Sequence, residues 1–197
     1  MIEPEVNKFN SVLFLDIDGV YNSDLFYKEK FGDIIYKSNK KPIHRIVTNF
    51  LRKKFKANEI SKYEYYEQNM CPKVMSLIND LCGETNMCVV ISASMRNGHD
   101  LQEIQDIFKH CGATFTIIDK TPYTGYERGT EISKWLKDNS EKWFGQPYYD
   151  FHRFCIVDDD SDFLINQQFN FFKVDNYCGF TPTNYSDIRK FLLHKTF

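Results

Sequence analysis

The chain has 197 residues, of which 42% are hydrophobic, and this is enough for one globular domain or for one domain with a modest insertion. Its net charge of -2 argues against a surface built as a whole for nucleic acid, although a local basic patch is compatible with it. No apolar run approaches the roughly eighteen residues of a membrane span, and the polar N-terminus does not resemble a signal peptide. We therefore expect a cytoplasmic protein with no membrane partner.

Short apolar runs alternate with helical patterns along most of the chain, which is typical of βα units. The expected strands cover residues 11–16, 87–92, 114–119, 153–158 and 170–174. Apolar residues recur at helical spacing between them, at Val74, Leu77, Ile78 and Leu81, at Leu101, Ile104 and Phe108, and at Ile132, Trp135 and Leu136. A last helix is expected at about 185–194, with Ser186 as its N-cap. The pattern predicts an α/β fold with a parallel central sheet flanked by helices.

The segment 21–70 interrupts this alternation. It is fifty residues long, whereas an ordinary βα connection takes about 2–6 residues, so it must contain structure of its own. Pro42 opens an amphipathic helix within it. The segment carries eleven Lys and Arg against six Asp and Glu, a net charge of +5, which leaves -7 for the rest of the chain. We expect a core made of residues 1–20 and 71–197, and a small, mostly helical, basic cap made of residues 21–70.

Polar side chains stand at the carboxyl ends of the expected strands, where ligands of open α/β sheets bind. They are Asp16 and Asp18 after the first strand, Ser92 after the second, Arg128 before the helix that follows the third, and Asp158, Asp159, Asp160 and Asp162 after the fourth. Carboxylates from two strands can share Mg²⁺, which prefers oxygen ligands. A hydroxyl and a fixed cation suit the oxygens of a phosphoryl group. These residues predict a site that handles phosphate.

The two aspartates after the first strand suit different chemical roles. Asp16 would be poised as a nucleophile, because a metal ion and an arginine neutralise the approach of one anion to another. Asp18, two residues later, would protonate the leaving oxygen and then activate water.

Four segments, LFLDIDGV, CVVIS, RGTEI and IVDDDSD, resemble in order the four motifs of the haloacid dehalogenase-like (HAD) superfamily. The finer features DIDGVYN, ISASMR, TP at 121–122 before RGTEISKWL, and GFT at 179–181 are similar to the HAD domain of Swiss-army-knife RNA repair proteins. The resemblance covers about 11–20 and 71–195 and leaves the insert unmatched. It implies a Rossmann-like HAD fold.

The resemblance also implies roles for individual residues. Asp16 would form an aspartyl phosphate, and Asp18 would be the acid and base. Ser92, with Ala93 beside it, would hold the phosphoryl oxygens. The implied Mg²⁺ ligands are Asp16, Asp18, Asp158 and Asp159.

Two assignments stay open from the sequence alone. The third motif of the superfamily usually holds a lysine, so Arg128 is the best-aligned cation here and Lys134, one and a half turns later, is the alternative. In the fourth motif, Asp158 pairs either with Asp159 or with Asp162.

Two further features allow more than one interpretation. Arg96 would bind the substrate's phosphate or its flanking groups, or pair with an acid. In the insert, FLRKKFK with Tyr63, Tyr65 and Tyr66 is either a basic, aromatic platform for a nucleic-acid end or a solvated helix face. The five histidines are dispersed without metal-ligand spacing, and each is interpreted as a surface or packing residue.

The sequence thus predicts a Mg²⁺-dependent phosphomonoesterase that forms an aspartyl-phosphate intermediate. The basic insert and the resemblance to RNA repair proteins favour the phosphates of nucleotides or of RNA and DNA ends as substrates. Asp18 favours a phosphatase, because dehalogenases of this superfamily lack an acid there. The alternatives are a protein or small-metabolite phosphatase of the same fold, and a non-catalytic binding module that has kept the fold.

Overall fold

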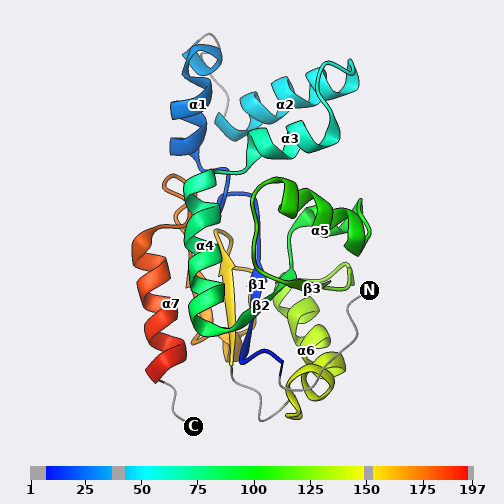
Figure 1. Cartoon of the computed structure of the whole chain (residues 1–197), viewed down its shortest axis with the longest axis vertical. Helices are drawn as coiled ribbons and strands as arrows, with labels where there is room; N and C mark the ends of the chain where they lie inside the picture. The colour runs from blue at the N-terminus through cyan, green and yellow to red at the C-terminus, as the bar shows by residue number, and fades with distance from the viewer. Residues whose placement is uncertain (1–7, 37–42, 149–152, 195–197) are drawn as a thin grey trace.

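The computed structural model describes residues 8–36, 43–148 and 153–194 and has an α/β fold around a five-stranded sheet (Figure 1). All the strand pairs are parallel, in the order β3-β2-β1-β4-β5. The strands are β1 (Ser11–Leu15), β2 (Met87–Ile91), β3 (Ile117–Lys120), β4 (Phe154–Asp158) and β5 (Phe171–Lys173). The predicted fold class is confirmed.

Helices connect these strands and also form the insert after β1. They are α1 (Asp24–Tyr36), α2 (Ile43–Lys56), α3 (Lys62–Asn69), α4 (Pro72–Thr85), α5 (Leu101–His110), α6 (Arg128–Phe144) and α7 (Pro182–His194). Two 3₁₀ turns cover Ser94–Asn97 and Ile165–Gln167. Within the described ranges, no helix combines the length and the apolar character that crossing a membrane requires.

The central strand β1 is buried on both faces, which explains its continuous apolar sequence. Leu13 and Leu15 pack against residues of α4, α5 and α7, whereas Val12 and Phe14 pack against residues of α6. The ring of Phe14 meets that of Trp135 edge-on, with 5.4 Å between the centroids. Since β1 lies in the middle of the sheet, the residues that follow it emerge at the centre of the carboxyl edge.

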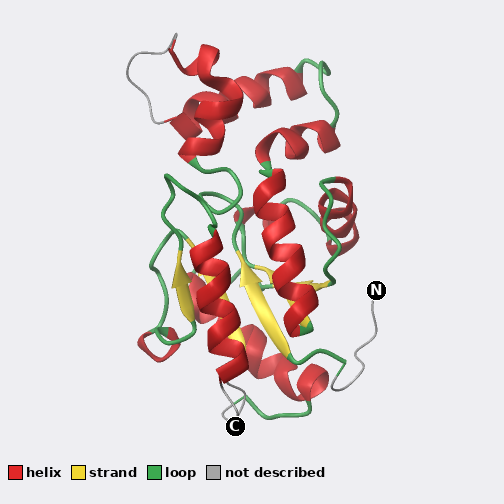
Figure 2. Cartoon of the chain, turned by 60° about the vertical axis from the view of Figure 1, so that its left-hand side comes forward, coloured by secondary structure: helices red, strands yellow, loops and turns green. Residues whose placement is uncertain are grey.

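The insert forms three helices, α1 to α3, which lie beyond the carboxyl ends of the strands (Figure 2). It has a small apolar cluster of its own, in which Phe26, Tyr27, Val47 and Leu51 are buried. The amphipathic helix expected after Pro42 is α2, although Pro42 itself lies outside the described residues. The helical insert predicted after the first strand is therefore confirmed.

Two predicted boundaries are wrong. The third strand begins at Ile117 and not at residue 114, because residues 112–116 turn the chain back from α5 to the sheet edge. The last helix begins at Pro182, so Ser186 lies inside it and is not its N-cap. Proline suits the first turn of a helix, and the Thr181 hydroxyl accepts a hydrogen bond from the backbone N–H of Asn184 at 3.4 Å.

Candidate active site

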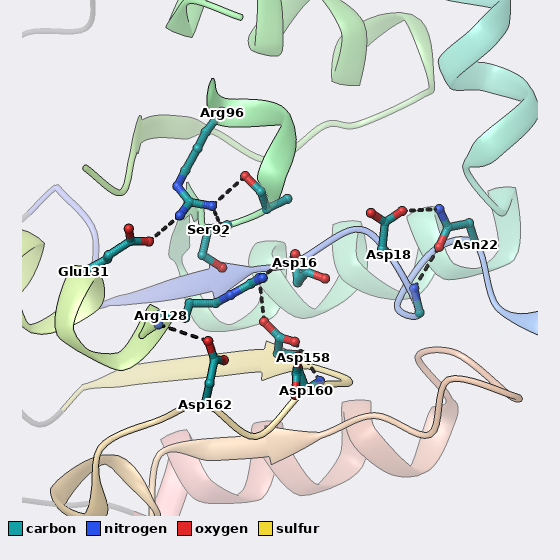
Figure 3. Close-up of polar contacts among 12 residues, drawn as sticks. Asp16, Asp18, Asn22, Ser92, Arg96, Arg128, Glu131, Asp158, Asp160 and Asp162 are labelled. Atoms are coloured by element: carbon teal, nitrogen blue, oxygen red, sulfur yellow. Dashed lines mark hydrogen bonds and ion pairs between the residues drawn. The ribbon is translucent and has the colours of Figure 1, made fainter. Parts of the chain in front are cut away.

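Asp16 and Asp158 meet at the carboxyl ends of the neighbouring strands β1 and β4, with one arginine between them (Figure 3). The Nη1 atom of Arg128 donates to Oδ1 of Asp16 at 2.6 Å and to Oδ2 of Asp158 at 2.7 Å. Asp158 is fully buried and Asp16 is 4% exposed. Two buried carboxylates therefore share one guanidinium group.

Burial dominates the electrostatics of this pair. Desolvation raises the pKa of Asp16 to about 6, and the adjacent Arg128 opposes that shift. Desolvation and then the charge of Asp16 raise the pKa of Asp158 to about 8, again against the effect of Arg128. A buried carboxylate pair of this kind favours the binding of further positive charge, because a cation stabilises the ionised form.

The N-terminus of α6 is fixed by the loop that follows β4, and this positions Arg128. The Asp162 carboxylate accepts a hydrogen bond from the backbone N–H of Arg128 at 3.2 Å, and its carbonyl accepts one from Gly129 at 3.1 Å. Asp162 thus caps the helix that carries the cation. The alternative cation, Lys134, lies on the exposed side of α6 and pairs with Asp138 at 2.9 Å.

An acidic cluster lies at this edge of the sheet. The carboxylates of Asp16, Asp158 and Asp159 each place an oxygen within 4.8 Å of the others. The structure therefore brings three of the four predicted metal ligands together, and of the two open pairings it groups Asp158 with Asp159. Oxygen donors from two strands in this arrangement fit a small, hard cation.

Asp18 stands apart from that cluster, although it too was predicted as a metal ligand. Its side chain is exposed and its Oδ1 atom accepts a hydrogen bond from Nδ2 of Asn22 at 2.7 Å. The Oδ1 atom of Asn22 in turn accepts from the backbone N–H of Gly19 at 2.8 Å. These two bonds hold the Asp18 carboxylate on the turn after β1, where solvent can reach it.

Gly19 occupies a position that a side chain does not fit. Its φ is +73°, and a Cβ atom there would meet the Asp159 carboxyl group. We expect Gly19→Ala to lower the free energy of unfolding by roughly 1–2 kcal/mol, from the left-handed backbone conformation and the displaced carboxyl group. Denaturant unfolding measures this.

The matched control is Gly83→Ala in α4, where a Cβ would have no neighbour within 4 Å. In an exposed helix, alanine is expected to be neutral or to stabilise by about 0.5–1 kcal/mol. Equal stability of the two variants would contradict the steric role given to Gly19.

Ser92 is the first residue after β2, and its backbone N–H donates to the carbonyl of Leu15 at 3.0 Å. Its side chain is fully buried, and its Oγ atom has no hydrogen-bond partner among the described residues. Figure 3 shows the hydroxyl directed toward the group formed by Asp16 and Arg128. Because an unpaired buried hydroxyl costs free energy, a ligand oxygen at this point would restore the missing bond.

Of the two alternatives for Arg96, contact with a phosphate and pairing with an acid, the structure shows the second. One terminal nitrogen donates to the Glu131 carboxylate, and the other donates to the carbonyl of Ala93 at 2.8 Å and to that of Ser92. Arg96 and Glu131 are both buried. The guanidinium therefore braces the backbone at 92–93 against α6, because the buried Glu131 carboxylate requires a counter-charge.

A cavity of about 310 Å³ opens beside Asp18, between the core and the insert. Its lining residues are Ile17, Asp18, Ala93, Ser94, Met95, Gly98 and His99 from the core, and Asn22, Thr48, Arg52, Tyr65, Tyr66 and Asn69 from the insert. A larger cavity of about 740 Å³ lies between β3 and α6, but neither Asp16 nor Asp18 lines it. Of the predicted site residues, Asp18 and Ala93 line the smaller cavity, whereas Asp159 lines a separate cavity of about 440 Å³.

Sequence reasoning missed His99, which lines this cavity from the loop before α5. Its Nε2 atom lies 2.7 Å from the Tyr66 hydroxyl of α3. That contact depends on how the insert packs against the core, and no local pattern in the sequence signals it.

The sheet is all-parallel, and an acid stands at the end of its central strand. A second acid lies on the neighbouring strand, and a cation lies on the helix that precedes that strand. These features define the class of HAD-like α/β domains. Residues 12–185 match the family described as "HAD domain in Swiss Army Knife RNA repair proteins". The chain belongs to this family, and the match also runs through the insert, which the sequence resemblance left uncovered. Neither the curated proteins nor the solved structures include a match to this chain.

Proposed function

We propose that the protein is a Mg²⁺-dependent phosphomonoesterase that acts through an aspartyl phosphate on Asp16. The observation that carries the proposal is the convergence of Arg128, Asp16 and Asp158 below the unpartnered hydroxyl of Ser92. A nucleophile, a fixed positive charge and a hydrogen-bond donor for a phosphoryl oxygen thus lie at one point, which is what phosphoryl transfer requires.

In the proposed reaction, an oxygen of Asp16 attacks phosphorus while the bond from phosphorus to the leaving oxygen breaks. Asp18 donates a proton to that leaving oxygen and becomes ionised. Asp18 then takes a proton from a water molecule, which attacks phosphorus and releases inorganic phosphate and the restored Asp16 carboxylate. Arg128 and Ser92 bind the phosphoryl oxygens, and Arg128 keeps Asp16 oriented.

The acidic cluster of Asp16, Asp158 and Asp159 would hold the Mg²⁺ ion. Its carboxylate oxygens lie within 4.8 Å of one another, and desolvation raises the pKa values of its buried members Asp16 and Asp158, so a bound cation would stabilise their ionised forms. When bound, Mg²⁺ supplies additional positive charge that lowers the repulsion between Asp16 and a phosphate anion.

The cavity beside Asp18 favours nucleotides or nucleic-acid ends as substrates. Arg52 supplies a positive charge there, and Tyr65 and Tyr66 supply aromatic surface, which together suit a phosphate and a base. Membership in a family of RNA repair proteins supports the same substrates. Proteins and small phosphorylated metabolites are the competing substrates, and a non-catalytic binding module is the competing function.

Phosphate release from a generic aryl phosphate tests the proposed reaction. We expect turnover with Mg²⁺ and loss of turnover on chelation, restored by added Mg²⁺. A panel of nucleotides, phosphorylated RNA and DNA ends, sugar phosphates and phosphopeptides then tests the substrate class. A folded protein that hydrolyses none of them would support the binding module and contradict the phosphatase.

The pH dependence of stability offers a separate test of the metal site. The pKa values of Asp16 and Asp158 lie above the ordinary value of 3.8, so the metal-free protein should lose stability as pH rises from about 4 to about 8. Because Mg²⁺ binds the ionised carboxylates, it should raise the melting temperature clearly at about pH 9 and little at about pH 5.

The Asp158→Asn variant is the control for this measurement. It removes a ligand and a buried charge at once, so both the loss of stability with pH and the effect of Mg²⁺ should become small. An equal effect of Mg²⁺ on both proteins would exclude this cluster as the binding site.

A further inference from the structure

Two cavities meet along the boundary between the insert and the core. The cavity beside Asp18 adjoins a second one of about 320 Å³, and both are lined by Arg52, Tyr65, Tyr66 and His99. The second cavity continues to Phe55, Lys56 and Lys62. We call the two cavities together the insert groove. It leads from Asp18 across α2 and α3, away from the acidic cluster.

A row of aromatic rings follows this groove. The ring centroids of Phe55 and Tyr65 are 5.9 Å apart, those of Tyr65 and Tyr66 are 5.3 Å apart, and those of Tyr66 and His99 are 5.6 Å apart. Phe55 is 41% exposed although it is large and apolar. Exposed aromatic surface of this kind stacks on nucleic-acid bases with little sequence preference.

The charges of the groove are complementary to a phosphodiester backbone. Arg52 and Lys56 are exposed and four residues apart on α2, which places them on one side of the helix. The Arg52 guanidinium lies beside the Tyr65 hydroxyl, where it opposes the rise in the pKa of Tyr65 that burial causes. Among the residues that line the groove, Asp18 is the one acid.

Polar contacts hold the two sides of the groove together. The Tyr66 hydroxyl lies 2.7 Å from Nε2 of His99, and Nδ1 of His99 lies 3.4 Å from Oε2 of Glu103. Lys62 of α3 donates to Oε1 of Glu103 of α5 at 2.7 Å. The groove is therefore formed before a ligand arrives, which reduces the entropic cost of binding.

We propose that the insert groove binds the nucleotide next to the terminal, phosphate-bearing nucleotide of a single-stranded nucleic acid. This inference rests on the proposed function and adds to it a preference for strands over mononucleotides. The terminal phosphate lies at Asp16, the adjoining base stacks on the aromatic row, and Arg52 and Lys56 neutralise the connecting phosphodiester.

The test compares kcat/KM for an aryl phosphate, a phosphorylated mononucleotide, and single-stranded dinucleotides and pentanucleotides of RNA and DNA with a terminal phosphate. A phosphopeptide of matched length completes the series. We expect a dinucleotide, of RNA or of DNA, to exceed the mononucleotide about tenfold, which is the effect of stacking one further base.

Substitutions on α2 test the charge. Arg52→Ala should lower the preference for the dinucleotide over the aryl phosphate about tenfold, and should reduce the slope of log(kcat/KM) against log salt concentration by about 0.7. Lys53→Ala removes the same charge from the next residue, which is exposed and does not line the groove. It should leave the preference within about twofold.

Substitutions on α3 test the stacking. Tyr65→Leu should lower the preference for the dinucleotide, whereas Tyr65→Phe, which keeps the ring, should retain most of it. Tyr63→Leu is the control, because Tyr63 is 37% exposed and packs against His110 outside the groove.

The outcomes separate this proposal from the one on which it rests. Failure to hydrolyse even the aryl phosphate overturns the proposed function and the groove proposal with it. Good hydrolysis of the aryl phosphate with equal turnover of mononucleotide and dinucleotide overturns the groove alone. The groove proposal alone is also overturned if Arg52→Ala and Lys53→Ala have equal effects, or if the phosphopeptide turns over faster than any oligonucleotide.

Discussion

Replacing Asp16 by asparagine is expected to lower the rate of phosphate release by about 10⁴-fold or more, because the variant keeps the shape of the side chain but loses the nucleophile. The fold should not suffer. Asp16 is a buried carboxylate whose pKa is raised, so its replacement removes an unfavourable charge near Asp158, and Arg128 keeps its contact with Asp158. Steady-state phosphate release and thermal unfolding, measured on the same preparation, separate the two effects.

Asp16→Ala is a second variant for this test, because an asparagine can deamidate to aspartate on storage and regain activity. Both variants should be inactive and folded. An Asp16→Asn protein that retains activity, with an unchanged mass, would exclude Asp16 as the nucleophile.

Arg128→Ala is expected to lower kcat by about 10²–10³, because the guanidinium is the positive charge that Asp16 and Asp158 share. Its removal leaves two buried carboxylates without their cation, so their pKa values should rise further and the pH at which activity appears should move upward. Arg128→Lys keeps the charge and should recover part of the loss. A pH profile of kcat for the three proteins checks both effects.

Lys134→Ala is the matched control for this substitution. Lys134 lies on the same helix and was the alternative cation, but its amino group is exposed and pairs with Asp138. Its removal should change kcat by no more than about twofold. A large effect of Lys134→Ala with a small effect of Arg128→Ala would reverse the assignment.

The convergence of Asp16 and Asp158 was predictable because it depends on topology alone. Carboxyl ends of neighbouring parallel strands meet at one edge of a sheet, and an uninterrupted apolar run predicts a strand buried on both faces. Small errors in strand boundaries, such as the late start of β3, leave this edge unchanged.

For Arg96 the sequence left two alternatives open, and it did not indicate which acid would be the partner. Its position in the sequence placed it beside Ser92, but its direction is set by Glu131, which faces inward from α6. Burial of an acid at that point follows from the rotation of α6 on the sheet. Periodicity predicts a buried face only to within about one residue position.

His99 and Asp162 show the same limit at longer range. His99 lines the cavity and contacts the Tyr66 hydroxyl of the insert. Asp162 caps a helix that begins 34 residues before it in the chain. Both roles depend on the packing of segments that are distant in sequence, and neither residue belongs to a pattern of its own. The basic and aromatic content of the insert was visible in the sequence, whereas its assembly into a groove was not.

The central claim is that Asp16 becomes phosphorylated, and the direct measurement is acid quenching after mixing with a substrate that carries a labelled phosphoryl group. The measurement is best made on Asp18→Asn with an aryl phosphate, because an activated aryl leaving group needs little protonation. The water that would release phosphate has lost its base in this variant, so the intermediate should accumulate. We expect a label on the protein that hydroxylamine removes, that maps to the peptide holding Asp16, and that is absent from Asp16→Asn. A protein that turns over substrate but never carries such a label, or that carries it on another residue, would exclude Asp16 as the phosphorylated residue.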